Sequence, residues 1–319
     1  MNLEDKLLDI LRRSRDYVSG SVLARQLSIS RSMVNKLIKS LKSKGFIIES
    51  HSRFGYKIID EDDLSKTNMF LDDLQTKLSF KALYFPYCET SQDLADYVAS
   101  QGAPEGTLII CESMSKGRGR LGRRWIAPKG GLWFTLVLRP PKLKSLHLLS
   151  LSTGLAVAKA IESVANVDAH LKWPNDVLVN NKKVSGILIE AKAEADMIKH
   201  VLVGIGINVN NIIPQYLSNI AISLIDITKE RIPRVTLLRS VLMHFDAYYS
   251  LLLKGETDKI VNEWIRKSLT IGKYVAVKLI NGLIIKGLAI GLDNEGRLLV
   301  RDDNNVIHSI DSGDVTHLM

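Results

Sequence analysis

A run of alternating glycines and arginines, Gly117-Arg-Gly-Arg-Leu-Gly-Arg-Arg-Trp125, constrains this 319-residue chain more than any other segment. Glycine lets the backbone approach a ligand closely and adopt φ values that other residues avoid. Arginine keeps its charge and presents a planar fork of donors that matches carboxylates and phosphates. No acidic residue occurs between Glu112 and Glu162. The run predicts a loop that binds an anion, although a solvated basic loop is an equally open interpretation of the run alone.

The same run has the spacing G-x-G-x-x-G of dinucleotide-binding loops. That motif follows a strand, opens a helix and precedes an acidic residue by about 20 positions. Residues 107–111 could form the strand, but the segment from Arg123 to Pro128 opens no helix, and the acidic residue is missing. We therefore exclude a dinucleotide site.

The composition is that of an ordinary globular protein, with 46% hydrophobic residues and enough length for two or three domains. A formal net charge of +9 favours anionic partners such as nucleic acid or nucleotides. Cys88 and Cys111 have no metal or redox spacing, so we do not expect disulfides to organise the fold. No apolar run approaches the roughly 18 residues of a membrane span, and the N-terminus lacks a signal-peptide pattern. We expect a cytoplasmic protein with no membrane partner.

Residues 1–60 contain twelve Lys and Arg against six Asp and Glu, which is +6 of the total charge. Apolar spacing predicts a helix from Leu3, a short helix from Gly20, and a third helix capped by Ser30 with an inner face from Met33 to Leu41. Residues 46–50 and 56–59 then form two strands of a hairpin. This order predicts a winged helix-turn-helix domain.

The outer face of the third helix is polar and basic. Lys36 and Lys39 would contact DNA phosphates, while Arg31, Ser32 and Asn35 could reach base edges. A small helical docking module with a solvated basic face is the alternative. The absence of acidic residues from position 17 through position 48 favours DNA.

The acidic run at residues 60–63 predicts a linker into a second domain, residues 67–269, in which helical and strand patterns mix. Helices are expected at 91–100 and 146–164, the second a core helix, and a strand at 132–138. From residue 270 to residue 319 short strands alternate with turns, which predicts a small β-barrel. The fold class is multidomain α+β.

Three further motifs lie in the central domain. Lys172-Trp-Pro-Asn-Asp176 leads into a strand and a tight turn at Asn180-Asn181. The return strand contains Lys183-Val-Ser-Gly-Ile-Leu-Ile-Glu190, and a later strand contains Gly204-Ile-Gly-Ile-Asn208. Glycine inside a strand marks a bulge or the close approach of a ligand or another backbone.

Together these segments resemble the bifunctional biotin protein ligase / biotin operon repressor family over the whole chain. The resemblance implies a winged helix-turn-helix domain, a central class II synthetase-like mixed α/β catalytic domain, and a C-terminal SH3-like β-barrel. It implies that biotin and ATP form biotinyl-adenylate, which a lysine of the biotin carboxyl carrier protein then attacks. It also implies operator DNA as a partner, and a homodimer when the adenylate is bound.

The resemblance also implies roles for individual residues. A carboxylate that meets a phosphate brings two anions together, so fixed cations must neutralise both. Our candidates for this catalytic role are Arg118, Arg120 and Lys183. Asp176 is expected to hold Mg²⁺. The remaining residues expected to bind ATP or the adenylate are Arg123, Trp125, Lys172, Asn175 and Asn208.

Biotin is expected on Thr90, Ser91 and Gln92, which match the Ser-Thr-Asn signature of the family. Met114 stands where the family usually has glutamine, and a thioether is only a weak hydrogen-bond acceptor. We expect the longer Gln92 to compensate for this loss at the ligand. The other residues expected to bind biotin are Arg118, Gly119, Arg120 and Lys183.

Two other functions stay open from the sequence. One is a ligand-sensing repressor without ligase activity, which pyrophosphate release would decide. The candidate cations and Asp176 argue against it. The other is a lipoate-type or different acyl-adenylate ligase, which titration with biotin and lipoate would separate. The glycine- and arginine-rich run argues for biotin.

Overall fold

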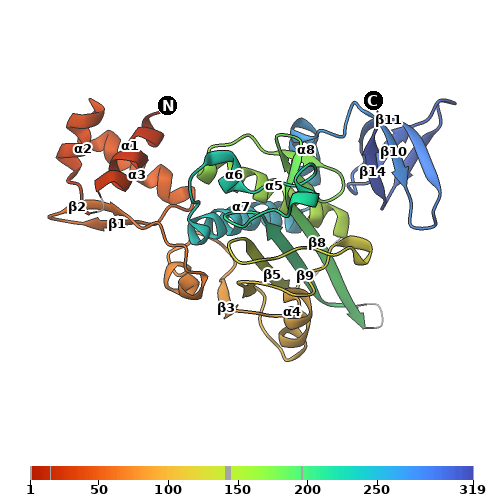
Figure 1. Ribbon diagram of the computed structural model, residues 1–319, viewed down its shortest axis with the longest axis horizontal. Coiled ribbons are helices and arrows are strands. Elements are labelled where there is room, and N and C mark those ends of the chain that lie inside the picture. Colours follow the sequence, from red (N-terminus) through yellow and green to blue (C-terminus); the bar gives the residue numbers. More distant parts are fainter. Residues whose placement is uncertain (1, 15, 141–144, 195–196, 319) are drawn as a thin grey trace.

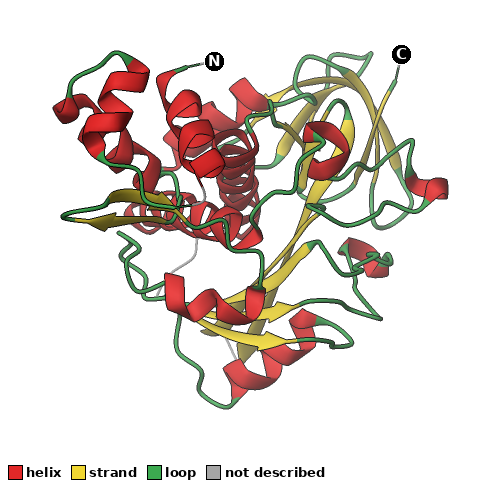
Figure 2. Ribbon diagram, turned by 60° about the vertical axis from the view of Figure 1, so that its left-hand side comes forward, coloured by secondary structure: helices red, strands yellow, loops and turns green. Residues whose placement is uncertain are grey.

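The computed structural model describes residues 2–14, 16–140, 145–194 and 197–318. The N-terminal helices and the C-terminal strands lie at opposite ends of the molecule, on either side of a larger central unit (Figure 1). The central unit contains the long strands and the two longest helices, seen again in Figure 2.

The N-terminal unit is a winged helix-turn-helix with its own hydrophobic core. Ser30 caps the third helix by accepting a hydrogen bond from Met33 N, as expected. Met33 itself is exposed, contrary to the prediction, because the buried stripe follows positions 34, 37, 38 and 41 and leaves position 33 outside it. The elements are α1 (Leu3–Ser14), α2 (Gly20–Leu27), α3 (Arg31–Ser43), β1 (Ile48–His51) and β2 (Gly55–Ile58).

The central unit is built on a mixed seven-stranded sheet in the order β3-β4-β5-β9-β8-β7-β6. Asn180 and Asn181 both have positive φ in the β7–β8 turn, as the sequence predicts. The strands are β3 (Lys81–Phe85), β4 (Thr107–Cys111), β5 (Leu132–Leu138), β6 (His170–Lys172), β7 (Asp176–Val179), β8 (Lys182–Glu194) and β9 (Met197–Ile207).

The two faces of this sheet have different partners. Side chains alternate along a strand, so Leu108 and Ile110 pack into the main core while Ile109 and Cys111 pack with α4 (Ser91–Ser100). On the main-core side lie α5 (Leu146–Ala165), α7 (Arg234–Lys254) and α8 (Thr257–Lys267). The shorter elements are η1 (Leu64–Phe70), η2 (Arg120–Gly122), η3 (Gln215–Leu217) and α6 (Leu224–Thr228).

Helix α5 is long and apolar enough to cross a membrane by length and composition, so the expectation that no segment approaches this limit is wrong for the part of the chain described. Its most apolar window is 72% buried inside the protein. Core helices pass the same test, and the burial identifies α5 as the core helix that the sequence predicts.

The C-terminal unit is a five-stranded antiparallel sheet in the order β13-β12-β11-β10-β14. Its buried side chains belong to the same cluster as the central core, so this unit is packed onto the central unit. The last strand was not predicted from the sequence. The strands are β10 (Tyr274–Lys278), β11 (Ile284–Leu292), β12 (Leu298–Arg301), β13 (Ile307–Ile310) and β14 (Asp314–His317).

Cys88 and Cys111 are joined in a disulfide bond, contrary to the expectation from their spacing. Parallel pairing of β3 with β4 places Phe85 beside Cys111, and Cys88 N donates a hydrogen bond to Ser113 O. The two Cα atoms are consequently 6.3 Å apart although 23 positions separate them in the sequence. A spacing argument cannot detect this proximity.

The acidic segment at residues 60–63 is more than a connector, because α7 holds it in place. Arg234 donates from Nε to Asp62 Oδ1 (2.8 Å) and from a terminal nitrogen to Glu112 Oε1 (2.8 Å). Asn210 Nδ2 also donates to Asp62 Oδ1 (3.3 Å). The Arg234 side chain is only 6% exposed. One buried cation therefore connects the linker to Glu112, which directly follows β4.

A second buried arginine on α7 holds the N-terminal unit itself. Arg239 Nε donates to Gly45 O (3.1 Å), directly after α3. Gly45 has a φ of +96°, and a Cβ there would lie 2.7 Å from Ser240 N. Glycine is required at this contact, which fixes the end of α3 against α7.

We predict that Arg234→Met lowers the free energy of unfolding by about 3 kcal/mol, since the change leaves Asp62 and Glu112 without their cation in a largely buried site. Arg231→Met is the matched control. Arg231 also contacts Asp62 (2.7 Å), but its side chain is 67% exposed, so we expect a loss of less than about 1 kcal/mol. Urea denaturation measures both, and equal losses would contradict the prediction.

Candidate active site and DNA-binding face

A cavity of about 720 Å³ lies beside β8 and β9, on the α4 side of the sheet. Its walls come from segments far apart in the sequence: the start of α4, the glycine- and arginine-rich loop, the β6–β7 turn, β8 and the end of β9. Every residue that the sequence analysis assigned to ligand binding lines this cavity. They are Thr90, Ser91, Gln92, Met114, Arg118, Gly119, Arg120, Arg123, Trp125, Lys172, Asn175, Asp176, Lys183 and Asn208.

The glycine- and arginine-rich loop folds back on itself as a tight hairpin. Trp125 N donates to Gly117 O (2.8 Å), and Gly119 N donates to Arg123 O (2.7 Å). A Cβ on Gly117 would lie 2.6 Å from Trp125 O, so this position requires glycine. No helix follows the loop, in agreement with the exclusion of a dinucleotide site.

Trp125 anchors this loop on two paired glycines of the sheet. Gly186 and Gly206 are opposite each other in the β8–β9 ladder, whose register is regular there, so neither is a bulge. A Cβ on Gly206 would lie 2.9 Å from the indole, and one on Gly186 would lie 3.2 Å from it. The close approach expected at these strand glycines is therefore made by the indole of Trp125.

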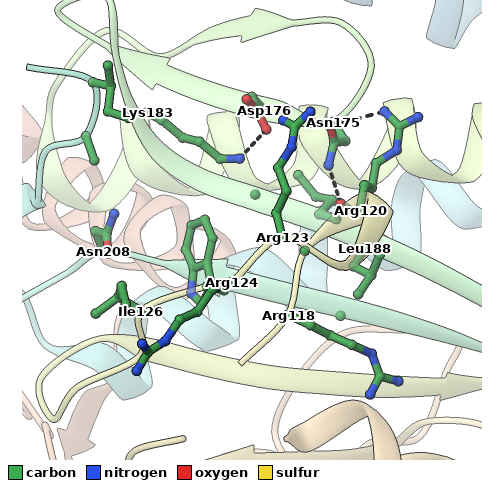
Figure 3. A pocket seen from close by; sticks show the side chains of 18 of the residues that line it. Arg118, Arg120, Arg123, Arg124, Ile126, Asn175, Asp176, Lys183, Leu188 and Asn208 are labelled. Atoms are coloured by element: carbon green, nitrogen blue, oxygen red, sulfur yellow. Dashed lines mark hydrogen bonds and ion pairs between the residues drawn. The ribbon is translucent and has the colours of Figure 1, made fainter. Parts of the chain in front are cut away.

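Lys183 and Asp176 form an ion pair at one end of the cavity. The ammonium of Lys183 points at the carboxylate of Asp176 (Figure 3), with Nζ 2.6 Å from Oδ1, although the approach is not that of a linear hydrogen bond. Lys183 Nζ also lies 5.2 Å from the centroid of the Trp125 ring. Asp176, the carboxylate expected to hold Mg²⁺, is thus neutralised by a lysine in this structure.

Two further cations face the same end. Lys172 forms no ion pair with any residue in the described ranges. Burial lowers the pKa of Lys172, and the positive charge of Lys183 lowers it further, whereas the negative charge of Asp176 acts in the opposite direction. Arg120 donates weakly to Asn175 Oδ1 (3.5 Å), and burial lowers its pKa as well. An arginine keeps its charge regardless. This end of the cavity is suited to phosphate.

Arg118 occupies a different place from the other candidate cations. It donates to Glu190 Oε2 (3.0 Å) and to Asp93 Oδ1 (2.5 Å), and it lies apart from the Lys183–Asp176 pair (Figure 3). The sequence analysis assigned no role at the site to Glu190 or Asp93. The sequence contained one indication that Glu190 belongs to the site. Side chains alternate along β8, so Glu190 lies on the same face of the strand as Gly186.

The C-terminal unit closes part of the cavity, which the sequence analysis did not anticipate. Arg120 donates to Ser312 Oγ, and Arg123 forms an ion pair with Asp314. Nothing local in the sequence reveals these contacts, since they depend on how two domains pack. The other lining residues from this unit are Ala276, Lys278, Ile284, Val315 and Thr316.

An apolar segment after β9 forms another part of the rim. Asn208 begins it, and its side chain accepts a hydrogen bond from Asn211 Nδ2 (3.1 Å). Ile212 is 85% exposed although its neighbours line the cavity. The lining residues of this segment are Asn211, Ile212, Ile213, Pro214, Leu217, Ile220 and Ala221.

The predicted DNA-binding residues form one exposed face of α3. Tyr56 OH donates to Asn35 Oδ1, which leaves the Asn35 amide nitrogen free to face outward, and Ser32 Oγ lies 2.8 Å from Ser30 Oγ. Beside this face the β1–β2 turn presents Phe54, stacked on His51 at 4.4 Å between ring centroids. The exposed residues of the face are Arg31, Ser32, Asn35, Lys36 and Lys39.

Comparison with known proteins identifies relatives of the whole chain. Three family models match: an HTH domain over residues 4–57, the biotin/lipoate A/B protein ligase family over residues 85–208, and the biotin protein ligase C-terminal domain over residues 270–318. The bifunctional ligase/repressor BirA of Bacillus subtilis (strain 168) is 34% identical over 320 residues, covering 98% of both chains. The corresponding Escherichia coli (strain K12) protein is 26% identical, covering 93% of this chain and 92% of its own.

Solved structures agree with these relatives. A biotin protein ligase from Aquifex aeolicus, in complex with biotin and ATP, has a TM-score of 0.63 and 31% sequence identity. It covers 74% of this chain and 97% of its own. The Bacillus subtilis protein matches over nearly the full length of the chain, and the three domain models together extend from its N-terminal to its C-terminal unit. The chain therefore belongs to the family of bifunctional biotin protein ligase/repressors.

Proposed function

We propose that the protein joins biotin to ATP, forming biotinyl-5′-AMP and pyrophosphate, and then transfers biotin to a lysine of the biotin carboxyl carrier protein. The observation that carries this proposal is the division of one cavity into two ends: a cationic end, around Lys172 and Lys183, and an end around Gln92 and Met114 that we call uncharged because its one charged lining residue, Arg118, is paired with Glu190 and Asp93. A ligand with a carboxylate at one end and an uncharged, hydrogen-bonding ring system at the other matches such a division, with the carboxylate at the cationic end. Biotin and ATP are the molecules bound in the Aquifex aeolicus biotin protein ligase, to which this chain is similar.

The cations would act on the first step. The carboxylate oxygen of biotin attacks the α-phosphorus of ATP, the new P–O bond forms, and the bond to pyrophosphate breaks. Lys183 is placed to hold the two anions together, since it is fixed by Asp176 and by the Trp125 ring. Lys172 and Arg120 would hold phosphate oxygens, and Arg123 and Asn208 would contact the nucleotide. No covalent enzyme nucleophile is required.

A Mg²⁺ ion fits this site if it arrives bound to ATP. Among the described residues no group of three or more His, Cys, Asp and Glu could hold an ion alone. Magnesium in nucleotide sites takes one or two carboxylates and completes its shell with phosphate oxygens and water. Asp176 would be that carboxylate, and the ion would supply additional positive charge at the phosphates.

The residues present also bear on the alternatives. A repressor that only senses its ligand has no need for Lys183, Asp176 and Lys172 in one place, so we favour an active ligase. A lipoate-type ligase remains the second candidate because the matching family model includes both kinds of ligase. The polar groups at the uncharged end of the cavity favour biotin, as argued below.

The N-terminal unit would bind operator DNA and repress transcription, as the names of the relatives indicate for those proteins. We propose that Lys36 and Lys39 contact phosphates and that Arg31, Ser32 and Asn35 read bases, since all five lie on one exposed face of α3. We further propose a homodimer when the adenylate is bound, and action in the cytoplasm without a membrane partner.

We predict that Lys183→Ala lowers kcat for biotinyl-adenylate formation by roughly 10²–10³, because a fixed cation facing two anions acts mainly on the transition state. Pyrophosphate release with biotin and ATP measures the effect. Lys182→Ala is the control, since Lys182 Nζ donates to Ser218 O (2.7 Å) outside the cavity lining. A near-normal kcat with only a raised KM for biotin would mean that Lys183 merely binds ligand.

We also predict that replacing Lys36 and Lys39 together by Gln weakens DNA binding and leaves adenylate formation unchanged. Each lost phosphate contact should make the plot of log affinity against log salt shallower by about 0.9. Binding to duplex DNA at several salt concentrations measures this slope. Lys254→Gln, at the far end of α7, should leave the slope unaltered; a slope equal to wild type in the double variant would exclude these lysines from the DNA face.

A further inference from the structure

The uncharged end of the cavity contains a carboxamide whose orientation is fixed by its neighbours. Gln92 is 3% exposed. Its Nε2 donates to Glu190 Oε2 (3.0 Å) and to Leu188 O (3.5 Å). A carboxylate and a backbone carbonyl can only accept hydrogen bonds, so the nitrogen of the amide must face them. The oxygen of the amide must consequently face the other way.

The amide oxygen has no partner within the described parts of the chain. Gln92 Oε1 is buried and makes no hydrogen bond. It lies over Gly204, where a Cβ would be 3.0 Å from it, and both residues line the cavity. A buried acceptor left unpaired is costly, and native proteins seldom leave one without a reason. Its position in the cavity wall indicates that a ligand supplies the missing donor.

The position along the sheet shows which part of the ligand would meet this oxygen. Gly204 pairs with Leu188 on β8, and the ammonium of Lys183 lies over Gly186, two residues before Leu188, which corresponds to roughly 7 Å along the strand. The indole of Trp125 lies over Gly186 and Gly206, beside this ammonium. A ligand whose carboxylate meets Lys183 therefore places the opposite end of its structure at Gln92.

We propose that Glu190 is a positioning residue that makes Gln92 an obligate hydrogen-bond acceptor, and that the pocket selects its substrate by an N–H group. This inference rests on the proposed function, and it adds how the substrate is recognised. Biotin has two ureido N–H donors in its ring system, whereas the dithiolane ring of lipoate has none. A site that hydrogen-bonds a substrate N–H rejects analogues that lack it far better than an apolar pocket can.

Arg118 makes the same arrangement more rigid. Its terminal nitrogen and Nε donate to the two oxygens of Glu190 (3.0 and 3.3 Å), so an arginine of the glycine- and arginine-rich loop holds the carboxylate that orients Gln92. Met114 does not take part in this network, since its Sδ accepts from Ser91 N (3.3 Å).

The test uses the full-length protein and isothermal titration with biotin and with two cyclic carbamates, in which one or the other ureido N–H of biotin is replaced by oxygen. Gln92→Met should weaken biotin binding about 5- to 150-fold, the range expected for one hydrogen bond to a buried group. One of the carbamates should lose a similar factor on the wild-type protein and lose nothing further on Gln92→Met. Gln101→Met, at the exposed end of α4, should bind like wild type.

Glu190→Gln tests the positioning role. A glutamine at position 190 can donate as well as accept, so the Gln92 amide is no longer held in one orientation. The ratio of biotin affinity to carbamate affinity should fall towards one, and this ratio is the readout because a general loss of packing would lower both affinities together.

An equal loss of affinity for biotin and for both carbamates in Gln92→Met would overturn the proposal, and so would wild-type affinity in that variant. Failure of the wild-type protein to bind biotin would instead contradict the proposed function. The two failures are therefore distinguishable.

Discussion

The contact between Trp125 and the paired glycines Gly186 and Gly206 determines the geometry of the cavity. Two neighbouring strands give up their side chains at opposite positions, and the indole fills the space with no room for a Cβ on either. Gly117 in turn cannot carry a side chain because the carbonyl of Trp125 lies against it. The charged loop is thereby fixed to the central sheet, and the sheet holds its arginines at the cavity.

This anchoring separates two chemistries within one cavity. On one side of the indole lie Lys183, Asp176 and Lys172, where charge dominates. On the other side lies Gln92, held by Glu190, which is itself paired with Arg118, so that the cation there is already neutralised. The strand spacing keeps the two apart, so anions can be concentrated at one end without attracting them to the other. A ligase for a carboxylate with a polar ring needs this arrangement.

The sequence was most informative where local patterns determine structure. Ser30 as a cap, the Asn180-Asn181 turn and the stripe of α3 apart from Met33 were predicted, because each depends on neighbours within a few residues. Helix α7 was missed because it is buried on most sides and even its arginines point inward, so no polar face alternates with an apolar one. The short strand β14 was missed because four residues carry too little pattern.

At the site, all the residues that the sequence motifs predicted to bind ligand line one cavity, whereas the ligands that they bind remain a proposal. Asp314, Ser312 and Glu190 were missed, since their roles depend on tertiary packing. The disulfide between Cys88 and Cys111 was missed for the same reason.

Arg234 and Arg239 attach the linker and the end of α3 to a single helix of the catalytic domain. The orientation of the recognition helix is therefore held by contacts to α7 as well as by the linker. In a two-fold dimer of such chains, the distance between the two recognition helices would be set by the catalytic domains alone. The spacing of the operator half-sites would then be encoded far from any residue that touches DNA.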